Sequence, residues 1–150
     1  MKILHFEDDY SVARLIAKVL RAELNDNSLD PLVKRHEKEM RKYLAEHQTP
    51  EVDLILLDVM VVYQRREDEE PEPVEIEAEG FHRAGIRILK LIRQAPNYSG
   101  VPIVLYSNLP VKDIQDAVRE AGIDPDSVKI VGKGDQGESL AAAIREALKK

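Results

Sequence analysis

Carboxylates directly follow two apolar runs of the chain. Glu7 and Asp8 come after the apolar residues 2–6, and Asp58 comes after residues 53–57. Carboxylates gathered in one pocket repel one another, which raises a pKa unless a cation joins them. A hard divalent ion such as Mg²⁺ takes oxygen ligands from one or two carboxylates, from carbonyls and from water. If the fold brings these acids together, they predict a divalent metal site.

A hydroxyl and an ammonium group follow two later apolar runs. Ser107 comes after residues 102–106, and Lys133 comes shortly after residues 128–131. A metal ion, a hydroxyl and an ammonium could each hold one oxygen of a tetrahedral phosphoryl group while a carboxylate attacks phosphorus. The four strand ends together therefore predict phosphoryl transfer to a carboxylate.

The elements that must position these groups alternate along the chain. The four apolar runs are continuous, as in strands buried on both faces of a parallel sheet, and residues 31–35 suit an edge strand. Apolar residues at helical spacing predict helices between the strands. These helices span residues 11–24 with Ser11 as cap, 37–47, 84–94, 110–121, and a last helix from a cap at Asp135, with Glu138 three positions on, to Lys150.

This alternation predicts the α/β class, as one domain over residues 1–150. We expect a doubly wound, flavodoxin-like parallel sheet of five strands in the order 2-1-3-4-5, with helices on both faces. Ligands of such sheets bind outside the carboxyl ends of the strands where the winding reverses. The polar residues described above all follow strands, so we expect them to meet at that edge.

Residues 61–83 do not fit the alternation. Asp58 lies about 25 residues before the next predicted helix, where such a loop usually takes about two to six. Residues 67–79 hold eight acids and no base. The alternating apolar and acidic residues at 74–79 predict a strand that pairs with 61–63 in a hairpin. A disordered loop is the alternative, because a high acid density disfavours compaction.

Charge and composition exclude several functions. The net charge is −6, and without the acidic run 20 acids face 22 bases, so no basic excess indicates direct binding of nucleic acid or an anionic membrane. No apolar run is long enough for a membrane span and no signal-peptide pattern is present, so we expect a cytoplasmic protein. The absence of cysteine excludes disulfides and thiol chemistry.

Taken in order, the strand ends resemble the signatures of response-regulator receiver domains of two-component and phosphorelay systems. The likeness rests on residues 2–9, 54–60, 103–108 and 128–133. An aspartate at the end of an apolar strand is common by itself, whereas four such segments in order are specific. The likeness covers nearly the whole chain and leaves residues 61–83 as an acidic insertion.

The resemblance implies a role for each residue at the strand ends. Asp58 would be the phosphoacceptor that becomes an aspartyl phosphate, Ser107 would bond one phosphoryl oxygen, and Lys133 would neutralise another. The metal would be Mg²⁺ or Mn²⁺.

The resemblance also implies a set of metal ligands. Asp8 and Asp58 would bind the ion directly, and Glu7 would act mainly through a bound water. The backbone carbonyl of Met60 would complete the protein ligands. Asp9 is interpreted as an acid near a helix N-terminus, and His5 as a packed strand residue.

Receiver domains take the phosphoryl group from a histidine kinase or a phosphotransfer protein. Signalling would then pass through protein contacts on the face built from residues 110–121, residues 128–131 and the last helix, to a downstream protein or to a second copy in a homodimer. Beyond Mg²⁺-dependent self-phosphorylation from phosphodonors and slow autodephosphorylation, we expect no independent turnover of a substrate.

Other functions compete with phosphoacceptance. A haloacid-dehalogenase-like phosphatase needs a second aspartate where Met60 stands, and a flavodoxin-like cofactor binder needs a phosphate loop where Glu7 and its acidic neighbours stand. The serious alternative is a receiver-like interaction module that acts without phosphorylation. It is favoured by Ile130, where many receivers have an aromatic residue, by Gly134, where they usually have proline, and by the acidic insertion.

Overall fold

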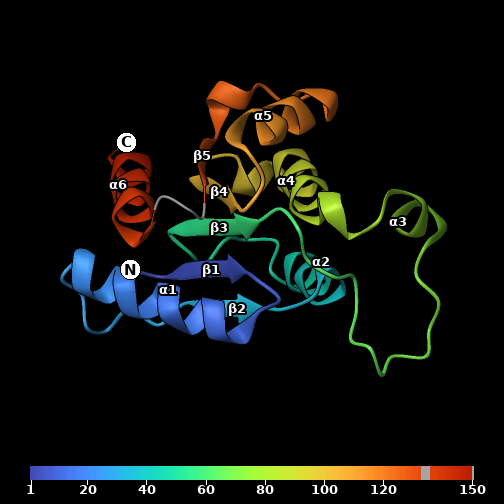
Figure 1. Ribbon diagram of the computed structural model, residues 1–150, viewed down its shortest axis with the longest axis horizontal. Helices are drawn as coiled ribbons and strands as arrows, with labels where there is room; N and C mark the ends of the chain where they lie inside the picture. The colour runs from blue at the N-terminus through green and yellow to red at the C-terminus, as the bar shows by residue number, and fades with distance from the viewer. Residues whose placement is uncertain (133–135, 150) are drawn as a thin grey trace.

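Five parallel strands form one sheet in the order β2-β1-β3-β4-β5 (Figure 1). The computed structural model describes residues 1–132 and 136–149, with side chains throughout these ranges except at 136–139. The strands are β1 (Ile3–Phe6), β2 (Leu32–Lys34), β3 (Leu54–Asp58), β4 (Ile103–Ser107) and β5 (Lys129–Gly132). The predicted doubly wound α/β fold and its strand order are confirmed.

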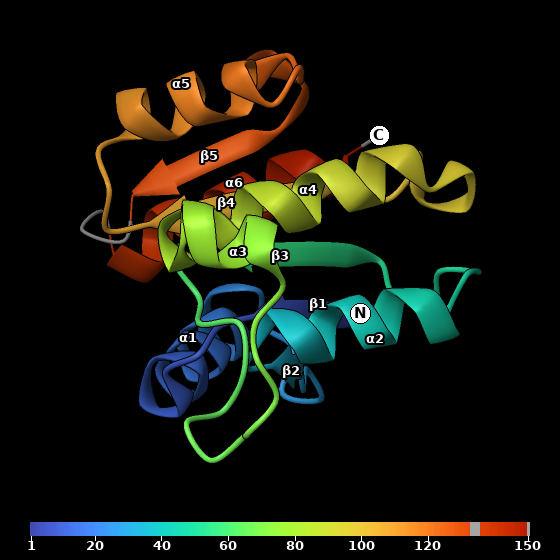
Figure 2. The same cartoon turned by 90° about the vertical axis from the view of Figure 1, so that its right-hand side faces the viewer.

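Helices cover both faces of the sheet (Figures 1 and 2). One face carries α1 (Tyr10–Glu23) and α6 (Gln136–Leu148). The other carries α2 (Glu37–Glu46), α4 (Ala84–Gln94) and α5 (Val111–Glu120). The connections hold α3 (Val74–Glu79) and the short 3₁₀ helices η1 (Phe81–Arg83), η2 (Pro96–Tyr98) and η3 (Pro125–Ser127). Among the described residues, no helix combines the length and apolar character needed to cross a bilayer.

The strands contribute to two separate hydrophobic cores, because successive side chains of a strand point to opposite faces. In β3, Ile55 and Leu57 pack toward α2, α4 and α5, whereas Leu54 and Leu56 pack toward α1 and α6. All four side chains are fully buried. Both faces of the central strands are therefore covered, and this explains why their sequences are continuously apolar.

The N-terminus of α1 is capped by Asp9 and not by the predicted Ser11. The Asp9 carboxylate accepts hydrogen bonds from the amides of Ser11 at 2.9 Å and Val12 at 3.2 Å. β1 ends at Phe6, so the chain enters the helix after only three residues and the acid reaches its free amides. The cap predicted for the last helix, Asp135 with Glu138, lies outside the residues and side chains that the structure describes.

The acidic insertion contains a helix where a hairpin was predicted. Residues 74–79 form α3, and Pro73, whose ring fixes its φ angle, stands at its N-cap. Acids in the first turn are favoured by the positive end of a helix dipole. Ile76 is buried, whereas Val74 is 78% exposed, so the apolar residues of this segment do not share one buried face as in a strand. The alternating pattern was too short to separate helix from strand.

Residues 61–63, the other predicted half of the hairpin, bind the start of α2 instead. Val61 is fully buried, and the carbonyls of Val62 and Tyr63 accept the amides of Glu37 and Lys38 at 2.9 and 2.8 Å. Amides in the first turn of a helix have no partner within the helix, so they are open to a neighbouring strand-like segment. The prediction of a hairpin failed because these amides compete for the same carbonyls.

An ion-pair network centred on the buried Glu37 joins the insertion to α2 and α4. Glu37 has no exposed surface, and its carboxylate accepts from Arg87 at 2.6 Å and from Arg41 at 2.8 Å. Arg87 also donates to Glu79 at 2.8 Å and to the carbonyl of Gly80 at 2.9 Å. Burial alone would lower the pKa of Arg87, but its bonds to the two glutamates outweigh burial and raise it. The arginine therefore stays charged and anchors the end of α3.

Candidate functional site

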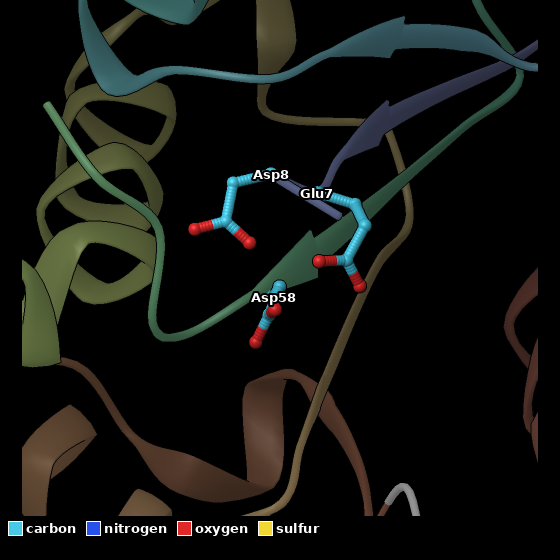
Figure 3. Close-up of side chains that lie close together, drawn as sticks. All are labelled: Glu7, Asp8 and Asp58. Carbon is cyan, nitrogen blue, oxygen red and sulfur yellow. The ribbon is translucent and has the colours of Figure 1, made fainter. Parts of the chain in front are cut away.

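Three carboxylates converge at the carboxyl edge of the sheet (Figure 3). Glu7, Asp8 and Asp58 each offer an oxygen, and these three oxygens lie within 4.8 Å of one another. Glu7 and Asp58 are only 1% and 3% exposed, whereas Asp8 is partly open to solvent. A group of hard oxygen donors with one open side fits a divalent cation such as Mg²⁺ or Mn²⁺.

The parallel pairing of β1 with β3 produces this convergence. Phe6 is the register partner of Leu57, so the next residues, Glu7 and Asp58, leave neighbouring strands at the same level. Both belong to the positions that point toward α1 and α6, as do Leu54 and Leu56 earlier in β3. Asp8 follows immediately and completes the cluster.

The segment after β3 donates backbone amides to two of the three acids. The amide of Met60 donates to Oδ1 of Asp58 at 3.3 Å, and the amide of Val62 donates to Oδ2 of Asp8 at 3.4 Å. The second contact comes from the beginning of the insertion. The segment after β3 therefore touches both Asp58 and Asp8, which ties the insertion to the carboxylate cluster.

Ser107 is the last residue of β4, next to the cluster. Its register partner is Gly132, the end of β5, and Asp58 pairs with the preceding residue, Tyr106. The Ser107 side chain is fully buried, and its Oγ accepts the amide of Leu109 at 3.2 Å. Lys133, predicted to neutralise a phosphoryl oxygen, lies outside the described residues. The structure therefore places four of the predicted side chains at one edge and leaves this lysine undescribed.

Tyr106 and His5 are residues that sequence reasoning did not assign to the site. The Tyr106 hydroxyl donates to Oε1 of Glu7 at 2.6 Å and lies 2.7 Å from Nε2 of His5. Burial raises the pKa of the Tyr106 phenol far above its ordinary value, and the neighbouring carboxylates raise it further. The phenol therefore keeps its proton. The sequence feature that could have pointed to these two residues is the presence of a polar side chain inside each of two otherwise apolar strands.

Asp8 and Asp9 are expected to differ in function although they are neighbours. Asp9→Ala removes the α1 cap and should lower the free energy of unfolding by about 1 kcal/mol. It keeps the amide that donates to Glu7 at 3.2 Å, so Mn²⁺ affinity should change little. Asp8→Ala removes a carboxylate of the cluster and should abolish Mn²⁺ binding. Denaturant unfolding and Mn²⁺ titration followed by electron paramagnetic resonance separate the two effects. A larger loss of affinity in Asp9→Ala would contradict this assignment.

The likeness of this chain to known proteins lies in its three-dimensional structure. No protein-family model matches it, and no curated protein matches its sequence. Solved structures match over its whole length. The BeF3-activated N-terminal receiver domain of RstA from Klebsiella pneumoniae matches with a TM-score of 0.65 and 23% identity, over 100% of both chains. The signal receiver domain of the DNA binding response regulator merR from Colwellia psychrerythraea 34H matches with a TM-score of 0.67 and 15% identity, over 100% of this chain and 99% of that one.

A metal-bound protein is among the matching structures. The Mn²⁺-bound form of the response regulator Rcp1 matches with a TM-score of 0.58 and 18% identity, over 98% of this chain and 88% of that one. At these identities the likeness establishes the fold. The chain has the fold of response-regulator receiver domains, as its resemblance to them implied.

Proposed function

We propose that this protein is a phosphoacceptor receiver domain of a two-component or phosphorelay system, with Asp58 as the phosphorylated residue. The observation that carries the proposal is the cluster of Glu7, Asp8 and Asp58 at the carboxyl edge of a receiver fold. In a doubly wound sheet this edge, between β1 and β3, is where ligands bind. Neither the cluster alone nor the fold alone would indicate this chemistry.

The proposed reaction forms a bond between Asp58 and phosphorus. A carboxylate oxygen of Asp58 attacks the phosphoryl group of a phosphohistidine, the new O–P bond forms as the N–P bond breaks, and the imidazole leaves with the electron pair and takes up a proton. The Ser107 hydroxyl holds one phosphoryl oxygen, and Lys133 neutralises another.

Mg²⁺ or Mn²⁺ would be held by Asp8, Asp58 and the Met60 carbonyl, with Glu7 acting mainly through a bound water. When bound, the ion supplies positive charge that offsets the developing charge on the phosphoryl oxygens. The protein's own contribution is to keep its acids close together in a largely buried edge. Without a cation, their mutual repulsion would act against the fold.

The proposed partners follow from this reaction. A histidine kinase or phosphotransfer protein donates the phosphoryl group, and the face built from α5, β5 and α6 contacts a downstream protein or a second copy. Autodephosphorylation is slow, because Met60 and Leu109 are apolar side chains that cannot orient an attacking water.

The proposal is tested by incubation with acetyl phosphate or phosphoramidate and Mg²⁺, followed by intact-mass measurement. We expect one added phosphoryl group, which is absent with chelator and absent in Asp58→Asn. Asp53→Asn is the matched control, because this exposed acid stands before β3, at the opposite edge of the sheet, and accepts the amide of Lys2 at 2.8 Å. No adduct on the parent protein at saturating donor would overturn the proposal in favour of an interaction module that acts without phosphorylation.

A further inference from the structure

Behind the carboxylate cluster, the buried side chains of His5 and Tyr106 form a continuous hydrogen-bonded chain that ends at Glu7. His5, Tyr106 and Glu7 are 0%, 2% and 1% exposed. Nε2 of His5 lies 2.7 Å from the Tyr106 hydroxyl, and that hydroxyl lies 2.6 Å from Oε1 of Glu7. The two rings are tilted by 46° with centroids 5.6 Å apart, so they meet at their polar atoms and do not stack.

The direction of each hydrogen bond follows from the number of protons available. A tyrosine hydroxyl has one proton, and here it is donated to the Glu7 carboxylate. The Tyr106 oxygen can then only accept from the imidazole, so Nε2 of His5 carries a proton and donates it. The chain therefore runs from His5 through Tyr106 to Glu7.

Both oxygens of Glu7 are held by protein donors. Oε1 accepts the Tyr106 hydroxyl, and Oε2 accepts the amide of Asp9 at 3.2 Å. Because Glu7 is almost completely buried, water cannot readily replace a lost donor, and the carboxylate would have to turn to satisfy its oxygens elsewhere. The orientation of Glu7 toward Asp8 and Asp58 thus depends on the donor that Tyr106 supplies.

We propose that Tyr106 is a positioning residue for the metal site, which orients the Glu7 carboxylate, and that His5 in turn fixes Tyr106. The inference rests on the proposed function, since it takes the carboxylate cluster as a metal site. Groups that hydrogen-bond metal ligands from behind set their orientation, and removing them typically weakens metal affinity about 10–100-fold. His5 belongs to β1, the strand that ends just before Glu7, whereas Tyr106 belongs to β4 and reaches both residues across the intervening β3.

The test is Mn²⁺ affinity of the full chain with Tyr106→Phe, which removes one hydroxyl and keeps the ring. We expect a dissociation constant about 10-fold higher, the lower end of that range because Glu7 acts on the ion mainly through a bound water. It is measured by electron paramagnetic resonance on protein shown to be folded by circular dichroism. The matched control is Tyr98→Phe. Tyr98 is equally buried and donates to the carbonyl of His47, away from the cluster. The Tyr98→Phe variant should lose stability without a change in Mn²⁺ affinity.

A second variant tests the other end of the chain. His5→Phe removes the donor to Tyr106 and should raise the Mn²⁺ dissociation constant by a smaller factor. In the Tyr106→Phe background it should add nothing, because the hydroxyl to which His5 donates is then absent. If Tyr106→Phe does not fold, His5→Phe alone decides, and an unchanged affinity overturns the proposal.

The outcomes separate this inference from the proposed function. Parent-like or tighter Mn²⁺ binding in Tyr106→Phe, with Asp58 still phosphorylated in the parent, overturns the positioning role and leaves the receiver function standing. A parent protein that binds no Mn²⁺ overturns both.

Discussion

Replacing Glu37 with alanine is expected to lower the free energy of unfolding by about 3 kcal/mol, because it leaves the Arg87 charge in a largely buried position without its main partner. Glu37 is completely buried, and Arg87 contacts it at 2.6 Å. The loss should lie at the lower end of the range for broken buried pairs, since Arg87 keeps Glu79 and the Gly80 carbonyl. Denaturant unfolding measures the change.

Glu46→Ala is the control for this prediction. Glu46 belongs to the same helix and pairs with Lys42 at 3.9 Å, but both side chains are exposed. Exposed pairs of this kind contribute about 0–1 kcal/mol. If Glu37→Ala and Glu46→Ala have the same stability, the network does not anchor the insertion to α2 and α4.

Gly85→Ala is expected to damage both the fold and the site. A Cβ atom at this position would lie 2.3 Å from the carbonyl oxygen of Asp58 and 2.7 Å from the Cα of Val59, and neither backbone atom can move by itself. The amide of Gly85 also donates to the Val59 carbonyl at 2.9 Å, which holds α4 against the segment after β3. Overpacking of this kind costs about 1–3 kcal/mol, and we expect its relaxation to shift the backbone of Asp58, which the added Cβ would contact.

Gly85→Ala should therefore lose Mn²⁺ affinity as well as stability, and acetyl phosphate should label it more slowly than the parent. Gly100→Ala is the matched control, because no atom lies within 4 Å of the Cβ that it would add. A surface change of this kind should alter stability by about 0.5 kcal/mol at most. Normal phosphorylation of Gly85→Ala would show that the segment after β3 can yield without disturbing Asp58.

The strand ends of the site could be predicted because their signals are local. A continuous apolar run identifies a buried parallel strand, and a polar residue that ends such a run must lie at the carboxyl edge of the sheet. The order of the strands then follows from the few ways in which such units connect. Glu7, Asp8, Asp58 and Ser107 were assigned to one edge in this way.

The structure of the insertion and the residue that caps α1 could not be predicted with the same success. The alternation at residues 74–79 suits a short strand or a short helix, and the carbonyls of Val62 and Tyr63 that bind α2 decide between them. Likewise, Asp9 and Ser11 are both good capping residues, so the position where β1 ends selects Asp9. In each case a contact outside the segment overrides its own preference.

The sequence by itself determined the class of fold and the carboxylates that stand at the strand ends. The period of the apolar residues, the order of the elements along the chain and the residue that ends each strand are all properties of neighbouring residues. Only the tertiary structure decided which groups stand behind those carboxylates. His5 and Tyr106 are 101 residues apart and meet in a buried hydrogen bond, and Glu37 and Arg87 are 50 apart and meet in a partly buried one. Such pairings depend on how strands and helices pack across the sheet, and no local pattern records which buried polar side chain will find which partner.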